Sequence, residues 1–117
     1  MQNSEIIATK VHGWVLWKPK ASRSKYGWFW KQGEHTVSYM LQGEPRFDPE
    51  NNPDQALDAL EAWDESAVYN YYVIQSWPNK VVKLYHGAAR VATEKYKNKS
   101  LSAAIVEAIC SAVGEVK

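Results

Sequence analysis

A helix with one apolar face, predicted for residues 100–114, constrains the fold more than any other feature of the sequence. Its apolar side chains recur at steps of three and four, which matches the 3.6-residue period of an α-helix; they are Leu101, Ala104, Ile105, Ala108, Ile109 and Ala112. Ser100 can cap the first turn, and Gly114 can adopt the left-handed conformation that ends a helix. The alanines permit close approach, so we expect this helix to pack across a β-sheet.

The upstream chain supplies strands for such a sheet. Branched and aromatic residues predict strands at residues 14–17, 26–31, 35–41, 71–76, 80–85 and 89–96. Helices are predicted at residues 4–11 and 52–64, the second opened by Asn52 and Pro53, which favour a helix start. Short connections favour antiparallel pairing. The sequence therefore predicts a single α+β domain over residues 1–117, with an antiparallel sheet of about five to six strands covered by helices in a sandwich-like arrangement.

Charge is segregated along the chain, although the formal net charge is only +1. Residues 10–31 and 80–99 are basic, and residues 44–65 between them are acidic. If the two basic stretches share a face, they create a positive field that attracts an anionic ligand. Alternatively, the acidic segment covers the basic ones, within one subunit or between subunits.

The remaining composition bears on location and partners. Cys110 is the only cysteine, so no disulfide framework is expected and a reducing compartment fits. No apolar run is long enough to span a bilayer, and residues 1–10 lack a signal-peptide core. We therefore expect a cytoplasmic protein with no membrane partner. Six Trp and seven Tyr indicate a binding surface or a homo-oligomer interface beyond the core.

Catalytic signatures are missing from the sequence. Cys110 lies within a helix of small residues, where a lone thiol favours packing over nucleophilic chemistry. His12, His35 and His86 form neither a metal-ligand spacing nor a paired phosphoesterase motif. The acids of residues 52–64 are typical of a solvent-facing helix surface rather than a metal site. We expect no enzyme, no cofactor and no metal site.

Binding of an anionic nucleotide fits the residue types better. Phosphates need positive groups or amide donors, and a base needs a flat apolar surface. Lys99 and Ser100 stand at the start of the closing helix, whose free amides favour an anion. The candidate ligand residues are Arg23, Lys25, Trp28, Trp30, Arg90, Lys99 and Ser100. Four of them have a structural alternative: Trp28 and Trp30 as core or interface residues, Arg90 as a strand-surface charge, and Ser100 as a helix cap.

Three short motifs resemble a known family. Residues 7–14 read IATKVHGW, residues 47–49 read FDP followed by Asp54, and residues 100–105 read SLSAAI followed by Ala108. In this order they are similar to the opening, the middle-helix start and the closing helix of phage ABA sandwich domain proteins. The chain departs from that family in a longer, basic, Trp-rich hairpin between Trp14 and Leu41.

The resemblance implies an accessory protein of a bacteriophage or prophage with no established catalytic residues. Some small phage proteins of comparable layout sequester nucleotide signals made by bacterial immune systems. We therefore expect an anti-defence protein that binds an anionic small molecule, such as a cyclic nucleotide, without turnover, as a homo-oligomer. Two alternatives stay open: a nucleic-acid-binding accessory protein, and a direct protein-protein inhibitor of a host factor.

Overall fold

Helix α3 (Leu101–Ala112) forms where the sequence predicts the closing helix. The computed structural model describes residues 2–17, 29–33, 35–40 and 47–114. The Ser100 hydroxyl oxygen accepts a hydrogen bond of 3.0 Å from the backbone amide of Ala103, and so caps the first turn. Beyond the last turn, Gly114 has a φ of +78°, a conformation that other residues rarely adopt. Both helix ends are therefore set by the local sequence.

The burial of α3 is wider than one stripe. Ala104, Ile105, Ala108 and Ile109 are buried as expected, whereas Leu101 and Ala112 are only partly buried. The helix also buries Val106 and Cys110. The reason is that α3 packs against strands on one side and against helix α2 (Pro53–Glu65) on another.

Helix α2 begins as its sequence indicates. The Asn52 side chain accepts a hydrogen bond of 3.2 Å from the amide of Gln55, with Pro53 in the first turn. The buried amide side chain of Gln55 in turn accepts a 2.6 Å hydrogen bond from the backbone amide of Asp48. This contact ties the preceding loop to the helix.

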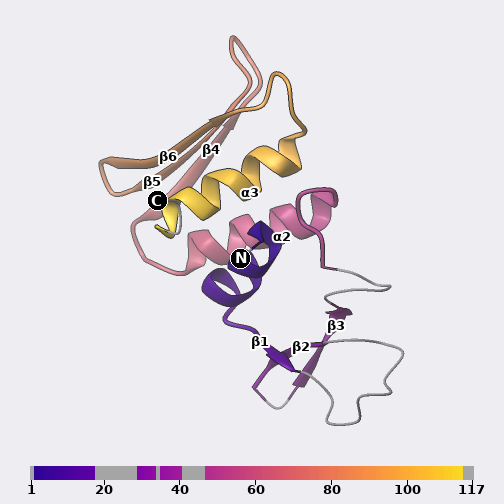
Figure 1. Ribbon diagram of the computed structural model, residues 1–117. Helices are drawn as coiled ribbons and strands as arrows, with labels where there is room; N and C mark the ends of the chain where they lie inside the picture. The colour runs from indigo at the N-terminus through magenta and orange to yellow at the C-terminus, as the bar shows by residue number, and fades with distance from the viewer. Residues whose placement is uncertain (1, 18–28, 34, 41–46, 115–117) are drawn as a thin grey trace.

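Strands β4 (Asn70–Gln75), β5 (Val81–His86) and β6 (Ala89–Lys95) form an antiparallel three-stranded sheet with β5 in the centre. Helices α3 and α2 lie on the same side of this sheet (Figure 1). Val82 and Leu84 of β5 are buried in the core that these helices share, while Tyr71 and Val73 of β4 stay exposed on the opposite face. The sheet is therefore covered by described elements on one face only.

A second antiparallel sheet contains β1 (Val15–Trp17), β2 (Phe29–Gln32) and β3 (His35–Met40), in that order. It lies at the other end of the molecule from the β4–β5 turn (Figure 1). The chain is thus α+β with antiparallel strands, as expected. The finer expectation of one sheet of five to six strands in a sandwich is not confirmed, because the described strands pair as two separate sheets.

The amino-terminal segment packs on the helical layer. Helix α1 (Asn3–Ile6) continues into a π-helical turn, η1 (Ile7–Val11), instead of the single α-helix predicted for residues 4–11. Ile6, Ile7 and Ala8 are buried in the same core as α3. Gly13, with a φ of +71°, then redirects the chain toward β1. Among the described residues, no helix combines the length and the apolar character needed to cross a membrane.

Candidate functional site

Four of the seven residues predicted to bind a ligand lie on the long hairpin. Arg23, Lys25 and Trp28 fall outside the described residues. Trp30 is described, and the prediction that its indole offers a binding surface is wrong, because only 1% of the residue is exposed. Its indole belongs to the main hydrophobic core, where it cannot stack on a ligand.

The start of α3 does not offer the free anion site that Lys99 and Ser100 suggested. The Lys99 ammonium donates a hydrogen bond to the Glu107 carboxylate and lies 3.6 Å from the Glu94 carboxylate. The hydrogen bond to Glu107 is the main reason that the pKa of Lys99 is raised. Ser100 is occupied as the helix cap. Two carboxylates beside the ammonium disfavour a phosphate at this position.

Arg90 is exposed on β6, as a ligand-binding or surface arginine would be. It stands directly opposite Tyr85 of β5, and Tyr85 stands opposite Tyr71 of β4. A bulge at this point of the β5–β6 pair sets that register, because Leu84 pairs with Ala92 while Tyr85 pairs with Arg90. Arg90 therefore belongs to the exposed face of the sheet, away from Lys99.

A different group of cations surrounds a pocket at the β4–β5 turn. The pocket has a volume of about 430 Å³, and we call it the lysine pocket. Its described lining comes from the turn and from the end of β6, and contains three lysines and no acid: Ser76, Pro78, Asn79, Lys80, Lys95 and Lys97. Strand pairing explains the assembly, because Val81 pairs with Lys95 and thereby places residue 80 beside residues 96 and 97.

Hydrogen bonds hold the frame of the lysine pocket. The Gln75 side-chain amide donates to the Asn79 carbonyl at 3.1 Å across the turn. The Tyr96 backbone amide donates to the Lys80 carbonyl at 3.1 Å, and the Tyr96 hydroxyl donates to the Gln75 carbonyl at 3.0 Å. Tyr96 thus ties the end of β6 to both strands that flank the turn. These hydrogen bonds join the backbone segments that line the pocket.

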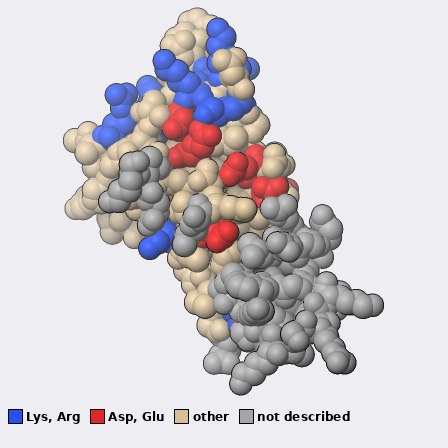
Figure 2. Space-filling model, in the orientation of Figure 1, with Lys and Arg blue, Asp and Glu red and all other residues tan. Residues whose placement is uncertain are grey.

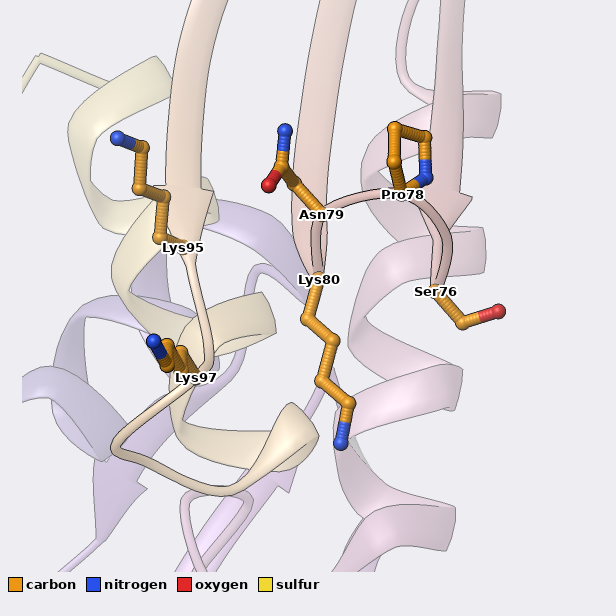
Figure 3. A pocket seen from close by; sticks show the side chains of 6 residues that line it. All are labelled: Ser76, Pro78, Asn79, Lys80, Lys95 and Lys97. Carbon is orange, nitrogen blue, oxygen red and sulfur yellow. The ribbon is translucent and has the colours of Figure 1, made fainter.

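The lysine side chains spread rather than converge. In Figure 3, the Lys95 and Lys97 side chains lie at the left of the view, whereas Lys80 extends downward, away from both. Trp77, between the lining residues Ser76 and Pro78, is 84% exposed. The pocket therefore supplies dispersed positive charge, which suits phosphate, and the turn that forms it contains an exposed tryptophan, the type of side chain that stacks on a flat base.

The same end of the molecule concentrates the visible positive charge. In Figure 2, Lys and Arg gather where Figure 1 places the β4–β5 turn and the β6–α3 connection, and Asp and Glu lie nearer the middle. The described residues contain no cluster of three or more His, Cys, Asp and Glu side chains that could hold a metal ion. The lysine pocket also lacks a described His, Cys or acid that could act as a base. Its chemistry is that of anion binding.

Sequence reasoning missed Trp77, Lys80, Lys95 and Lys97 as site residues. It did identify the basic stretch of residues 80–99 and the two strands, at residues 71–76 and 80–85, that flank the turn. The signal that could have joined them is the hairpin register of residues 80–85 and 89–96. Antiparallel pairing over the full length of these two strands places Lys80 near Lys95 and Lys97.

Comparisons of the chain with protein-family models, with curated proteins and with solved structures found no match. The resemblance to phage ABA sandwich domain proteins therefore stays a prediction.

Proposed function

We propose that this protein binds a nucleotide-type anion in the lysine pocket and holds it without chemical conversion. The observation that carries the proposal is the joint placement of Lys80, Lys95 and Lys97 around one pocket, in a turn that also contains the exposed residue Trp77. Lysine ammonium groups donate hydrogen bonds to phosphate oxygens, and an indole provides a stacking surface for a base. These are the groups expected earlier of the hairpin residues, now supplied by another part of the chain.

The biological role belongs to the same proposal. If the chain is a phage or prophage accessory protein, as its short motifs suggest, binding without turnover would sequester a nucleotide signal of the bacterial host. The lack of a described base in the pocket supports binding over hydrolysis. Direct inhibition of a host protein by the Trp-rich hairpin stays an alternative prediction, since much of that hairpin lies outside the described residues.

Titration calorimetry with adenosine diphosphate at low salt tests the proposal. We expect Lys95→Gln combined with Lys97→Gln to weaken binding roughly tenfold or more, because one hydrogen bond to a charged group contributes about 1.5 to 3 kcal/mol. We also expect Trp77→Ala to weaken binding, through loss of the stacking surface.

Lys99→Gln is the matched control. Lys99 carries the same charge two residues from Lys97, but its ammonium is already engaged by Glu107 and Glu94. It should therefore leave the affinity for adenosine diphosphate nearly unchanged. Equal losses of affinity in the control and in the double variant would show that the nucleotide is attracted by the overall positive charge and not by the lysines of the pocket. No binding by the unaltered protein would overturn the proposal.

A further inference from the structure

The exposed face of the β4–β6 sheet continues directly from the lysine pocket. Strand pairing orders this face in three rows across β4, β5 and β6. The row farthest from the pocket contains Tyr71, Tyr85 and Arg90, and the middle row contains Val73, Lys83 and Thr93. The row that borders the pocket contains Gln75, Val81 and Lys95, of which Val81 is buried, with 5% of the residue exposed. We call this surface the open sheet face.

Charge on the open sheet face has one sign. Its three rows contain three cations, Lys83, Arg90 and Lys95, and no acid. Glu94, the acid on β6, pairs with the buried Val82 and so belongs to the opposite face, where it approaches Lys99. The cations are spaced along the strands, which suits an anion that is itself extended.

Aromatic surface accompanies this charge. The rings of Tyr71 and Tyr85 stack with centroids 4.7 Å apart and planes within 6° of parallel, and Tyr71 remains 46% exposed. Val73 and Val91 are 41% and 39% exposed. A stacked aromatic pair held on a sheet and flanked by cations provides a platform for bases that are not paired in a duplex.

We infer that the ligand is a short single-stranded oligonucleotide, whose phosphates run from the lysine pocket along the open sheet face and whose bases stack at Tyr71. This inference rests on the proposed function and names the class of nucleotide. Four residues separate the Tyr85 row from the Lys95 row, a distance of about 13 Å at roughly 3.3 Å per residue. A stacked strand advances about 3.4 Å per nucleotide, so about four nucleotides span the face.

The divergent lysines of the pocket fit this ligand. Lys80 extends away from Lys95 and Lys97 (Figure 3), so the three do not surround one phosphate. Successive phosphates of a chain can meet separated cations, whereas a mononucleotide reaches only some of them. The affinity should therefore rise with chain length up to about four nucleotides and then level off.

Fluorescence anisotropy with a labelled single-stranded hexamer of deoxyadenosine, compared with adenosine diphosphate in calorimetry, tests the inference. The hexamer should bind at least tenfold more tightly than adenosine diphosphate. Tyr71→Ala should weaken the binding of the hexamer roughly 5- to 150-fold, the usual range for loss of one stacking aromatic side chain. It should leave the binding of adenosine diphosphate unaffected. Tyr71→Phe should restore the binding of the hexamer, because it keeps the ring.

Arg90→Gln provides a second variant at an exposed position, in case Tyr71→Ala disturbs the sheet. Arg90→Gln should weaken the binding of the hexamer and leave the binding of adenosine diphosphate unchanged. If the unaltered protein binds adenosine diphosphate but the hexamer binds no more tightly, this inference fails while the proposed function stands. If instead a second copy of the chain covers the open sheet face, light scattering will show a dimer. Tyr71→Ala will dissociate this dimer, and the hexamer will not compete with it. That result also overturns the inference.

Discussion

Among the described residues, His12 is one whose ionisation the fold opposes. Its ring stacks on Trp14 with centroids 4.4 Å apart and planes within 13°, and meets the edge of Phe47 at 5.9 Å. Burial lowers the pKa of His12, and the nearby charge of Asp58 offsets only part of this effect. The folded state therefore favours the neutral ring more than the unfolded state does.

We expect His12 to make the protein less stable in mild acid. Because the pKa is lower in the folded state, the unfolded chain binds more protons at any pH between the two pKa values. The contribution of His12 to the free energy of unfolding should therefore be complete above about pH 6.5, the usual pKa of histidine. It should decrease as the pH drops below that value. Urea denaturation between pH 4 and pH 8 measures this change.

His12→Phe supplies the comparison, since it keeps an aromatic ring beside Trp14 and cannot take up a proton. The difference in unfolding free energy between the two proteins should grow as the pH falls below the pKa of a free imidazole. A difference that stays constant across the range would mean that His12 is protonated equally well in both states.

At the scale of single elements, changes to the cap of α3 should alter the stability of the protein and leave its nucleotide affinity unchanged. Ser100→Ala should lower the free energy of unfolding by about 1 kcal/mol, because the amide of Ala103 loses its hydrogen-bond acceptor. Ser100→Asp, which keeps an acceptor at the same place, should restore most of that loss. Neither change should alter nucleotide affinity in calorimetry; a weaker affinity in Ser100→Ala with normal stability would return Ser100 to the binding site.

The one-sided cover of the β4–β6 sheet gives a second prediction for an element. Leu84→Ala, on the covered face, should destabilise the protein by about 2 to 5 kcal/mol, since it leaves a cavity under α3. Val73→Ala, on the open sheet face, should cost less than about 1 kcal/mol. Denaturant unfolding compares the two, and equal costs would mean that both faces of the sheet are packed.

The elements that were predicted from the sequence are those whose signals are local. The ends of α3 depend on Ser100 and Gly114, and the start of α2 depends on Asn52, all of which act within one turn. The lysine pocket was not predicted because Lys80 and Lys95 come to line the same pocket only through the pairing of β5 with β6. The sequence left Trp30 open between a ligand contact and the core, because alternation shows which residues share a face, and not which face is buried.

For the whole molecule, the division of the strands into two sheets is the largest departure from expectation. Composition and short connections predict strands and antiparallel pairing, and the structure has both. They do not specify whether the strands before α2 join those after it, because that choice depends on contacts far apart in sequence. As a consequence, the β4–β6 sheet has described elements on one face only, and it lies at the basic end of the molecule (Figures 1 and 2).

Salt dependence tests whether this end of the molecule acts as one charged surface. Each phosphate neutralised on a single strand contributes about −0.7 to the slope of log affinity against log salt concentration. About four phosphates along Lys80, Lys83, Arg90, Lys95 and Lys97 would give a slope of about −2.8 for the hexamer of deoxyadenosine. Arg90→Gln should reduce the slope by about 0.7 units.

Lys99→Gln should leave that slope unchanged, because Glu94 and Glu107 already neutralise its ammonium. Measurements of hexamer anisotropy from low salt to about the physiological range, on the unaltered protein and both variants, give the three slopes. Equal reductions in Arg90→Gln and Lys99→Gln would mean that net charge alone attracts the strand. A slope near zero in all three would mean that the strand makes no contact with these cations, and that the hexamer binds through its bases alone.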